Sequence, residues 1–228
     1  MSDLTVVLLP GLDGTGNLFR RLVDQTPPGF RTQVVSYPTD QVLGYDALEA
    51  MIRAQIPMDR PYIVLGESFS GPLSVALAAN PIGDLVGVVM AATFVTPPAL
   101  PVLRHISRGW VIRIPVPLWV MRLAMGTDDE ELVKGVLAAR GAAYSEVFAH
   151  RIRSTLAVDV RKQLAAITKP ILYLQATQDR VVPARCLRDI LEVRDDVHVE
   201  QLESTHYILQ LHPVEAWAAI ERFVASAE

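Results

Sequence analysis

The chain alternates between short, continuous apolar runs and longer segments in which apolar residues recur with helical spacing. Uninterrupted apolar runs rich in β-branched residues are typical of strands buried on both faces of a parallel sheet. Their alternation with helical segments predicts βαβ units. We therefore expect an α/β fold, with a mostly parallel central sheet and helices on both faces. The predicted strands cover residues 4–9, 32–37, 62–65, 85–91, 171–176 and 197–202.

The pattern changes between residues 96 and 156, where no strand run occurs. Prolines interrupt the first half of this segment. Thr127 is followed by Asp128, Asp129 and Glu130, which predicts a helix that is capped by Thr127, has acidic residues in its first turn and ends at Gly141. A second helix is predicted over 142–156. We expect 96–156 to be a helical insertion into a core made of residues 1–95 and 157–228. The core helices are predicted at 17–25, 45–55, 72–79, 160–167, 183–191 and 214–225.

Length and charge narrow the class of protein. A chain of 228 residues suits one α/β domain, and a net charge of -4 argues against nucleic acid or an anionic membrane as a partner. The single cysteine, Cys186, allows no internal disulfide and predicts a reducing, cytoplasmic location. Residues 85–103 form the longest uncharged run, but three prolines in its second half favour a strand followed by a loop over a membrane span. The oligomeric state is not predicted.

The stretch Gly66-Glu67-Ser68-Phe69-Ser70-Gly71 joins the third predicted strand directly to a helix. This arrangement places one serine on a sharp turn at the carboxyl edge of the sheet, where open α/β folds bind ligands. Gly66 and Ser70 stand two residues on either side of Ser68, where larger side chains would collide. A pattern this short also arises by chance, so partners for Ser68 must come from elsewhere in the chain.

A serine hydroxyl becomes a useful nucleophile only beside a base, which in turn needs a carboxylate to fix its tautomer. Asp179 follows the predicted strand 171–176, and His206 follows the last strand. Asp179 could equally be an ordinary turn aspartate, and His206 a surface histidine. His212 is the second choice for the base.

Several of these segments match the motifs of one family. The turn at Ser68 resembles the G-x-S-x-G nucleophile elbow of α/β-hydrolases, with Ser70 in place of the second glycine. Residues 176–183 resemble the family's G-x-x-D-x-x-V-P turn, with Ala176 where glycine is usual. Pro213 stands seven residues after His206, as is common in the family. Residues 10–12 are similar to the family's H-G-x loop, with proline replacing histidine. The resemblance covers nearly the whole chain and identifies it as a compact α/β-hydrolase with an inserted helical lid.

The resemblance implies a role for each residue. Ser68 would be the nucleophile, His206 the general base and Asp179 the acid that orients it. The backbone N–H groups of Leu12 and Phe69 would form the oxyanion hole. No metal or cofactor is implied, and the glycine-rich loop at 11–16 has neither dinucleotide spacing nor a P-loop lysine.

Two acidic residues beside these motifs are expected to have structural roles. Asp13 could cap the following helix or turn or line the substrate entrance, and we favour the capping role. We expect Glu67 to orient the elbow, with its side chain directed away from that of Ser68.

The lid is rich in apolar residues, of which some must pack on the core and the remainder could wall an acyl site. We expect Trp110, Trp119 and Met121 to contact substrate. The predicted substrate is a small-molecule ester or thioester with an apolar acyl group. Two other classes stay open: an acyltransferase or C–C bond hydrolase with the same triad, and a non-catalytic ligand receptor.

Overall fold

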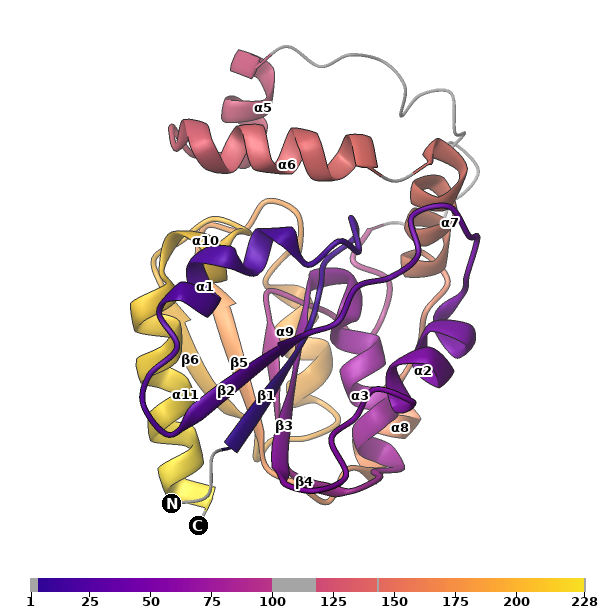
Figure 1. Cartoon of the computed structure of the whole chain (residues 1–228), viewed down its shortest axis with the longest axis vertical. Helices are drawn as coiled ribbons and strands as arrows, with labels where there is room; N and C mark the ends of the chain where they lie inside the picture. The colour runs from indigo at the N-terminus through magenta and orange to yellow at the C-terminus, as the bar shows by residue number, and fades with distance from the viewer. Residues whose placement is uncertain (1–3, 100–117, 143, 228) are drawn as a thin grey trace.

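Six parallel strands form the central sheet in the order β2-β1-β3-β4-β5-β6 (Figure 1). The computed structural model describes residues 4–99, 118–142 and 144–227. The sheet and the helices on both of its faces confirm the predicted fold class. The strands are β1 (Leu4–Leu9), β2 (Phe30–Val34), β3 (Pro61–Glu67), β4 (Asp84–Ala91), β5 (Ile171–Ala176) and β6 (His198–Leu202).

Helices cover the two faces of the sheet in separate groups. One face packs against α1 (Arg20–Asp24) and α11 (Pro213–Ala227). The other packs against a larger group, namely α2 (Tyr45–Arg53), α3 (Gly71–Ala79), α8 (Arg161–Ala166) and α9 (Arg185–Leu191). Shorter elements connect them: the 3-10 turns η1 (Asn17–Phe19) and η2 (Ser68–Ser70), and the helix α10 (Ile208–Leu211).

The alternation of side chains along a strand explains the continuous apolar runs. In β1, Val7 and Leu9 belong to the core on the α3 face, whereas Val6 and Leu8 belong to the core on the α11 face. All six residues of β1 are buried, so every position must be compatible with the interior.

The second strand begins and ends earlier in the chain than predicted. The predicted range was 32–37, but β2 begins at Phe30 because Leu4 pairs with Phe30 at the start of the ladder. The backbone then leaves the sheet, since the Tyr37 N–H donates to the Gly14 carbonyl at 2.7 Å. Apolar residues therefore continue beyond the strand because the chain stays buried, although it is no longer in the ladder.

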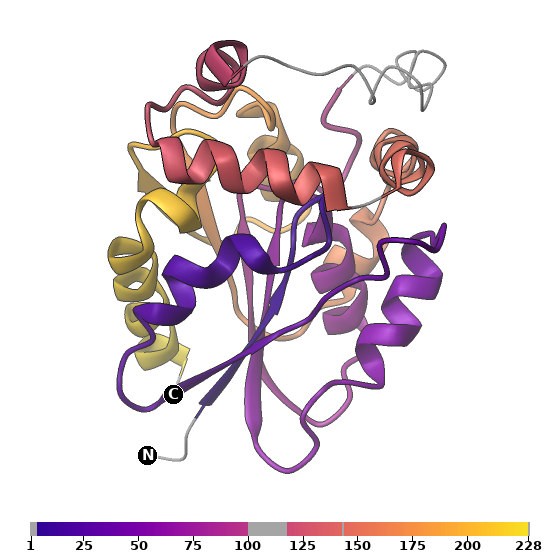
Figure 2. The ribbon, with the colours of Figure 1, turned by 45° about the horizontal axis from the view of Figure 1, so that its top comes forward.

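The segment between β4 and α8 contains α5 (Leu118–Met125), α6 (Glu130–Ala142) and α7 (Ser145–Thr155). Figures 1 and 2 show α5 and α6 above the carboxyl ends of the strands, with α7 to one side near α2. Helix α6 begins later than predicted, because the carboxylate of Asp129 accepts the Leu132 N–H at 2.9 Å and takes the capping role expected of Thr127.

The boundaries 96–156 of a separate lid remain a prediction. Within the described ranges, no helix has the length and apolar character needed to cross a membrane.

Candidate active site

Ser68 lies on a strained turn at the carboxyl end of β3. Its φ of 50° falls in the left-handed region, which non-glycine residues rarely adopt. Gly66 makes this turn possible, because a Cβ there would lie 2.5 Å from the Ser70 carbonyl oxygen and 2.7 Å from Ser74 Oγ. The hydroxyl of Thr93, just after β4, donates to the Ser68 carbonyl and braces the turn from the neighbouring strand.

Ser70 is fully buried at the position where the motif usually has glycine. Its hydroxyl donates to the carbonyl of Pro10 and lies 2.6 Å from the phenolic oxygen of Tyr37. The extra side chain is therefore accommodated because its polar atom finds partners. These bonds also join the elbow to the loop that follows β1.

The structure brings Ser68, His206 and Asp179 together in one chain of hydrogen bonds. His206 Nε2 lies 2.9 Å from Ser68 Oγ, and His206 Nδ1 lies 2.7 Å from Asp179 Oδ2. The other carboxylate oxygen of Asp179 accepts the N–H groups of Val181 and Val182 at 2.7 and 2.8 Å. The side chains of Asp179 and His206 are largely buried. With Nδ1 donating to the carboxylate, Nε2 is free to accept the serine proton.

The second choice for the base, His212, does not contact Ser68. Its Nδ1 lies 3.7 Å from the carboxylate of Glu215 at the start of α11. His206 instead occupies the loop between β6 and α10, at the same edge of the sheet as the elbow.

The loop after β1 lies beside the elbow. An ideal Cβ built on Gly11 would lie 3.9 Å from Ser68 Cβ. The Gly14 N–H donates to the Gly11 carbonyl at 3.1 Å, which closes a turn with Leu12 at its second position. In a trans peptide the C=O and N–H point in opposite directions, so the Leu12 N–H points out of the turn. The carboxylate of Asp13 accepts the Thr15 N–H at 2.8 Å, which is the structural role expected of it.

Phe69 provides the other proposed oxyanion donor. The ring of Tyr45 stacks on that of Phe69 with centroids 4.9 Å apart. The Tyr45 hydroxyl donates to the Phe69 carbonyl at 3.0 Å. The backbone on the C-terminal side of Ser68 is thus held from α2. The participation of Leu12 and Phe69 in an oxyanion hole stays a prediction.

A cavity of about 340 Å³ opens above Ser68, with walls that are mostly apolar. Met121 lines it, and its contact with substrate stays a prediction. Trp119 is 69% exposed on α5 and is absent from the described lining, whereas Trp110 lies outside the described residues. The described lining comprises Gly11, Leu12, Asp13, Leu18, Glu67, Ser68, Met121, Val136, Ala139, Arg140, Phe148, Val181, His206 and Tyr207.

Glu67 lines the same cavity as Ser68, so the expectation that its side chain points away was wrong. Strand alternation ends at Ser68, where the positive φ turns the chain into η2. The Glu67 carboxylate accepts a hydrogen bond from Gln210 Nε2 at 2.8 Å. Burial raises the pKa of Glu67 to about 7, against the opposing effects of Gln210 and His206.

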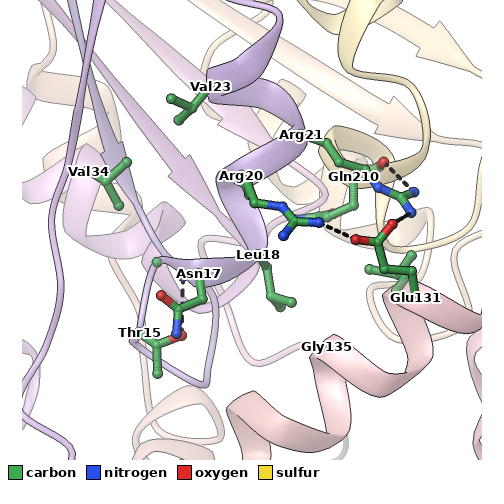
Figure 3. Close-up of a pocket in the computed structure, with 12 residues that line it drawn as sticks. Thr15, Asn17, Leu18, Arg20, Arg21, Val23, Val34, Glu131, Gly135 and Gln210 are labelled. Carbon is green, nitrogen blue, oxygen red and sulfur yellow. Dashed lines mark hydrogen bonds and ion pairs between the residues drawn. The ribbon is translucent and has the colours of Figure 1, made fainter.

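A second hollow, of about 680 Å³, lies between η1, α1 and α6 (Figure 3). Figure 3 shows Arg20 and Arg21 reaching from α1 toward Glu131 on α6. Arg21 also pairs with Asp129 at 2.5 Å, and its contact with Glu131 measures 2.8 Å. These ion pairs attach α6 to the core. Because they are partly exposed, each contributes only modestly to the stability of the fold. Arg21 further donates to the carbonyl of Gln210, the partner of Glu67, at 3.4 Å.

The fold and the geometry at the elbow define an α/β-hydrolase. The model of the alpha/beta hydrolase family matches residues 5–220, so the chain belongs to that family and is a hydrolase. It is similar to a pimeloyl-[acyl-carrier protein] methyl ester esterase of Photobacterium profundum, with 28% identity over 83% of this chain and 81% of that protein.

Two solved structures show the same fold. A thermophilic esterase from Thermogutta terrifontis (malate bound) has a TM-score of 0.81 and 16% identity, over 99% of this chain and 91% of that chain. MenH from S. aureus has a TM-score of 0.80 and 14% identity, over 100% of this chain and 95% of that chain.

Proposed function

We propose that the protein is a serine esterase that cleaves a small-molecule carboxylic ester through an acyl-enzyme. The observation that carries this proposal is the chain of hydrogen bonds that runs from Ser68 Oγ through His206 to Asp179 at the floor of the cavity. The similarity to a methyl ester esterase supports an ester as the substrate, ahead of a thioester.

In the proposed reaction, Ser68 Oγ attacks the ester carbonyl while its proton passes to His206 Nε2. Asp179 stabilises the imidazolium that results. The carbonyl oxygen becomes an oxyanion, which the N–H groups of Leu12 and Phe69 would bind. The bond to the leaving alkoxide then breaks, and His206 returns the proton to that oxygen. Water then completes the cycle. His206 takes a proton from the water molecule, and the resulting hydroxide attacks the carbonyl carbon of the acyl-enzyme. The bond to Ser68 Oγ breaks, His206 returns the proton to that oxygen, and the carboxylic acid is released.

The cavity supports an apolar acyl group of limited length. Its walls include Leu18 from η1, Val136 from α6 and Phe148 from α7. A volume of about 340 Å³ lies at the small end of the range for ligand pockets, which favours short and medium acyl groups.

We also propose that residues 96–156 act as a lid, and that the enzyme is cytoplasmic. Helices α5, α6 and α7 each contribute residues to the cavity wall above Ser68, which supports the first proposal. Cys186 is a buried free thiol, which supports a reducing compartment.

The test is hydrolysis of p-nitrophenyl esters of increasing acyl length by the wild-type protein and by Ser68→Ala. We expect the wild type to prefer short or medium acyl chains, and Ser68→Ala to lose at least 10³-fold in kcat, roughly the range for a missing nucleophile. The matched control is Ser226→Ala, which changes an exposed serine on α11 and should keep wild-type turnover. Wild-type activity in a folded Ser68→Ala protein would disprove the proposal.

Labelling with a fluorophosphonate probe separates an enzyme from a ligand receptor of the same fold. We expect covalent labelling of the wild type and of Ser226→Ala, but not of Ser68→Ala. Addition of an alcohol acceptor or of a β-diketone would then reveal acyl transfer or C–C bond cleavage by the same residues.

A further inference from the structure

We infer that Arg151 is a positioning residue that fixes the loop carrying the proposed oxyanion donor Leu12. This inference rests on the proposed function. Arg151 comes from α7, far from Leu12 in the sequence, and is only 2% exposed. Among the described residues it ranks as the largest of the fully buried side chains.

The guanidinium of Arg151 donates mainly to backbone carbonyls. Its Nη1 donates to the Leu12 carbonyl at 3.1 Å and to the Asp13 carbonyl at 2.7 Å, and its Nη2 donates to the Pro38 carbonyl at 2.9 Å. The guanidinium carbon lies 5.6 Å from the centroid of the Tyr37 ring. One side chain thus joins the loop after β1 to the segment after β2.

The loop has room for this side chain because position 14 is a glycine. Gly14 has a φ of 75°, and a Cβ there would lie 2.8 Å from the guanidinium carbon of Arg151. The next carbonyl along, that of Gly14, accepts the Tyr37 N–H at 2.7 Å. Three consecutive carbonyls, at 12, 13 and 14, therefore have donors from outside the loop.

This anchoring sets the direction of the Leu12 N–H. Gly11 and Gly14 give the loop more backbone freedom than other residues would. The Gly11 carbonyl is held inside the turn by the Gly14 N–H, and the Leu12 carbonyl is held by Arg151. Because both peptides that flank Leu12 are fixed, its N–H keeps one direction before substrate arrives. Such preorganisation is what an oxyanion hole needs, since donors already in place require no reorganisation during the reaction.

Only arginine has a planar fork that can serve three carbonyls at once. Lysine keeps the charge but presents a single ammonium group. Burial lowers the pKa of Arg151, with Asp13 and Tyr37 opposing that effect. The positive charge of Arg151 is offset by the dipoles of the carbonyls that it contacts and by the nearby Asp13.

The experiment compares Arg151→Lys and Arg151→Met with Arg153→Met, which removes an exposed arginine from the same helix. Turnover of p-nitrophenyl butyrate is measured with the folded fraction of each protein, obtained from near-UV circular dichroism. Binding of an alkyl trifluoromethyl ketone is measured in parallel, because its adduct with Ser68 carries an oxyanion. Loss of one oxyanion donor typically lowers kcat by about 10²–10³-fold.

We expect Arg151→Met to lose about 10²-fold or more in kcat per folded molecule, with KM within about threefold, because the loss falls on the transition state. Affinity for the ketone should fall in parallel with kcat, and Arg151→Lys should lie between Arg151→Met and the wild type. Arg153→Met should match the wild type.

Two results would overturn the inference. One is full kcat and ketone affinity per folded molecule in either Arg151 variant. The other is a loss of activity that only follows the loss of folded protein, which would make Arg151 a structural residue. Failure of the proposed function is distinct from both, because Ser68→Ala would then remain active.

Discussion

Glu67→Gln tests whether a carboxylic acid is buried at the floor of the cavity. The pKa of Glu67 is raised to about 7 from an ordinary value of 4.5, chiefly by burial. At low pH the group is neutral in both the folded and the unfolded chain. As the pH rises above 4.5 the unfolded chain ionises first, so the folded state loses stability until the pH passes about 7.

Each pKa unit corresponds to about 1.4 kcal/mol, so the folded wild type loses about 3 kcal/mol across this interval. Glutamine has nearly the same shape, and its side-chain oxygen can still accept the hydrogen bond from Gln210. It cannot ionise, so the variant avoids the loss. We expect the stability of Glu67→Gln relative to wild type to rise by about 3 kcal/mol between pH 4.5 and pH 8.

The measurement is urea unfolding of both proteins at intervals between pH 4.5 and pH 8.5. The test is how the difference in the free energy of unfolding between variant and wild type changes with pH. The size of that difference at low pH is not used, because it depends on how the amide packs. Glu221→Gln, which removes an exposed charge on α11, serves as the control and should follow the wild type. A difference between Glu67→Gln and wild type that stays constant over the whole range would refute the reasoning.

Two further substitutions test the groups around Ser68. Asp179→Asn should lower kcat by roughly 10⁴-fold, the loss typical of an imidazole held in the wrong tautomer, while the protein stays folded. Steady-state kinetics with a p-nitrophenyl ester would measure the loss, and a value below about tenfold would contradict the role of Asp179. Ser70→Ala should lower the free energy of unfolding by about 1–3 kcal/mol, because it leaves Tyr37 and Pro10 each without a buried partner. In urea unfolding, Tyr37→Phe combined with Ser70→Ala should cost less than the sum of the single changes; strict additivity would show that the two hydroxyls do not interact.

The central strands of the sheet could be predicted because they are buried on both faces. Apolar runs such as 4–9 and 171–176 coincide with β1 and β5 for that reason. The edge strand β2 is partly exposed, so its apolar residues no longer mark its ends, and its start depends on pairing with Leu4. Parallel strands also place their carboxyl ends at one edge, which is why residues as distant as Ser68, Asp179 and His206 could be expected to meet.

The contacts of Glu67 and Arg151 could not be predicted in the same way. The direction of Glu67 depends on the positive φ of Ser68, which breaks the alternation of the strand. Arg151 reaches a carbonyl 138 positions earlier in the chain, and nothing in its local sequence separates it from the exposed Arg153. Contacts of a side chain with distant backbone carbonyls leave no pattern of spacing to detect.

The attachments of α6 and α7 to the core have a mechanical consequence. Helix α7 is fixed through a buried guanidinium, whereas α6 is held to α1 by partly exposed ion pairs at Arg20 and Arg21. Salt screens the exposed pairs far more than the buried contacts. The cover over the cavity is therefore held by buried polar contacts on the side of the Leu12 loop, and by ion pairs together with apolar contacts of α6 on the side next to α1. Raising the ionic strength should therefore weaken one part of the attachment of α6 and leave the buried contacts between α7 and the Leu12 loop unchanged.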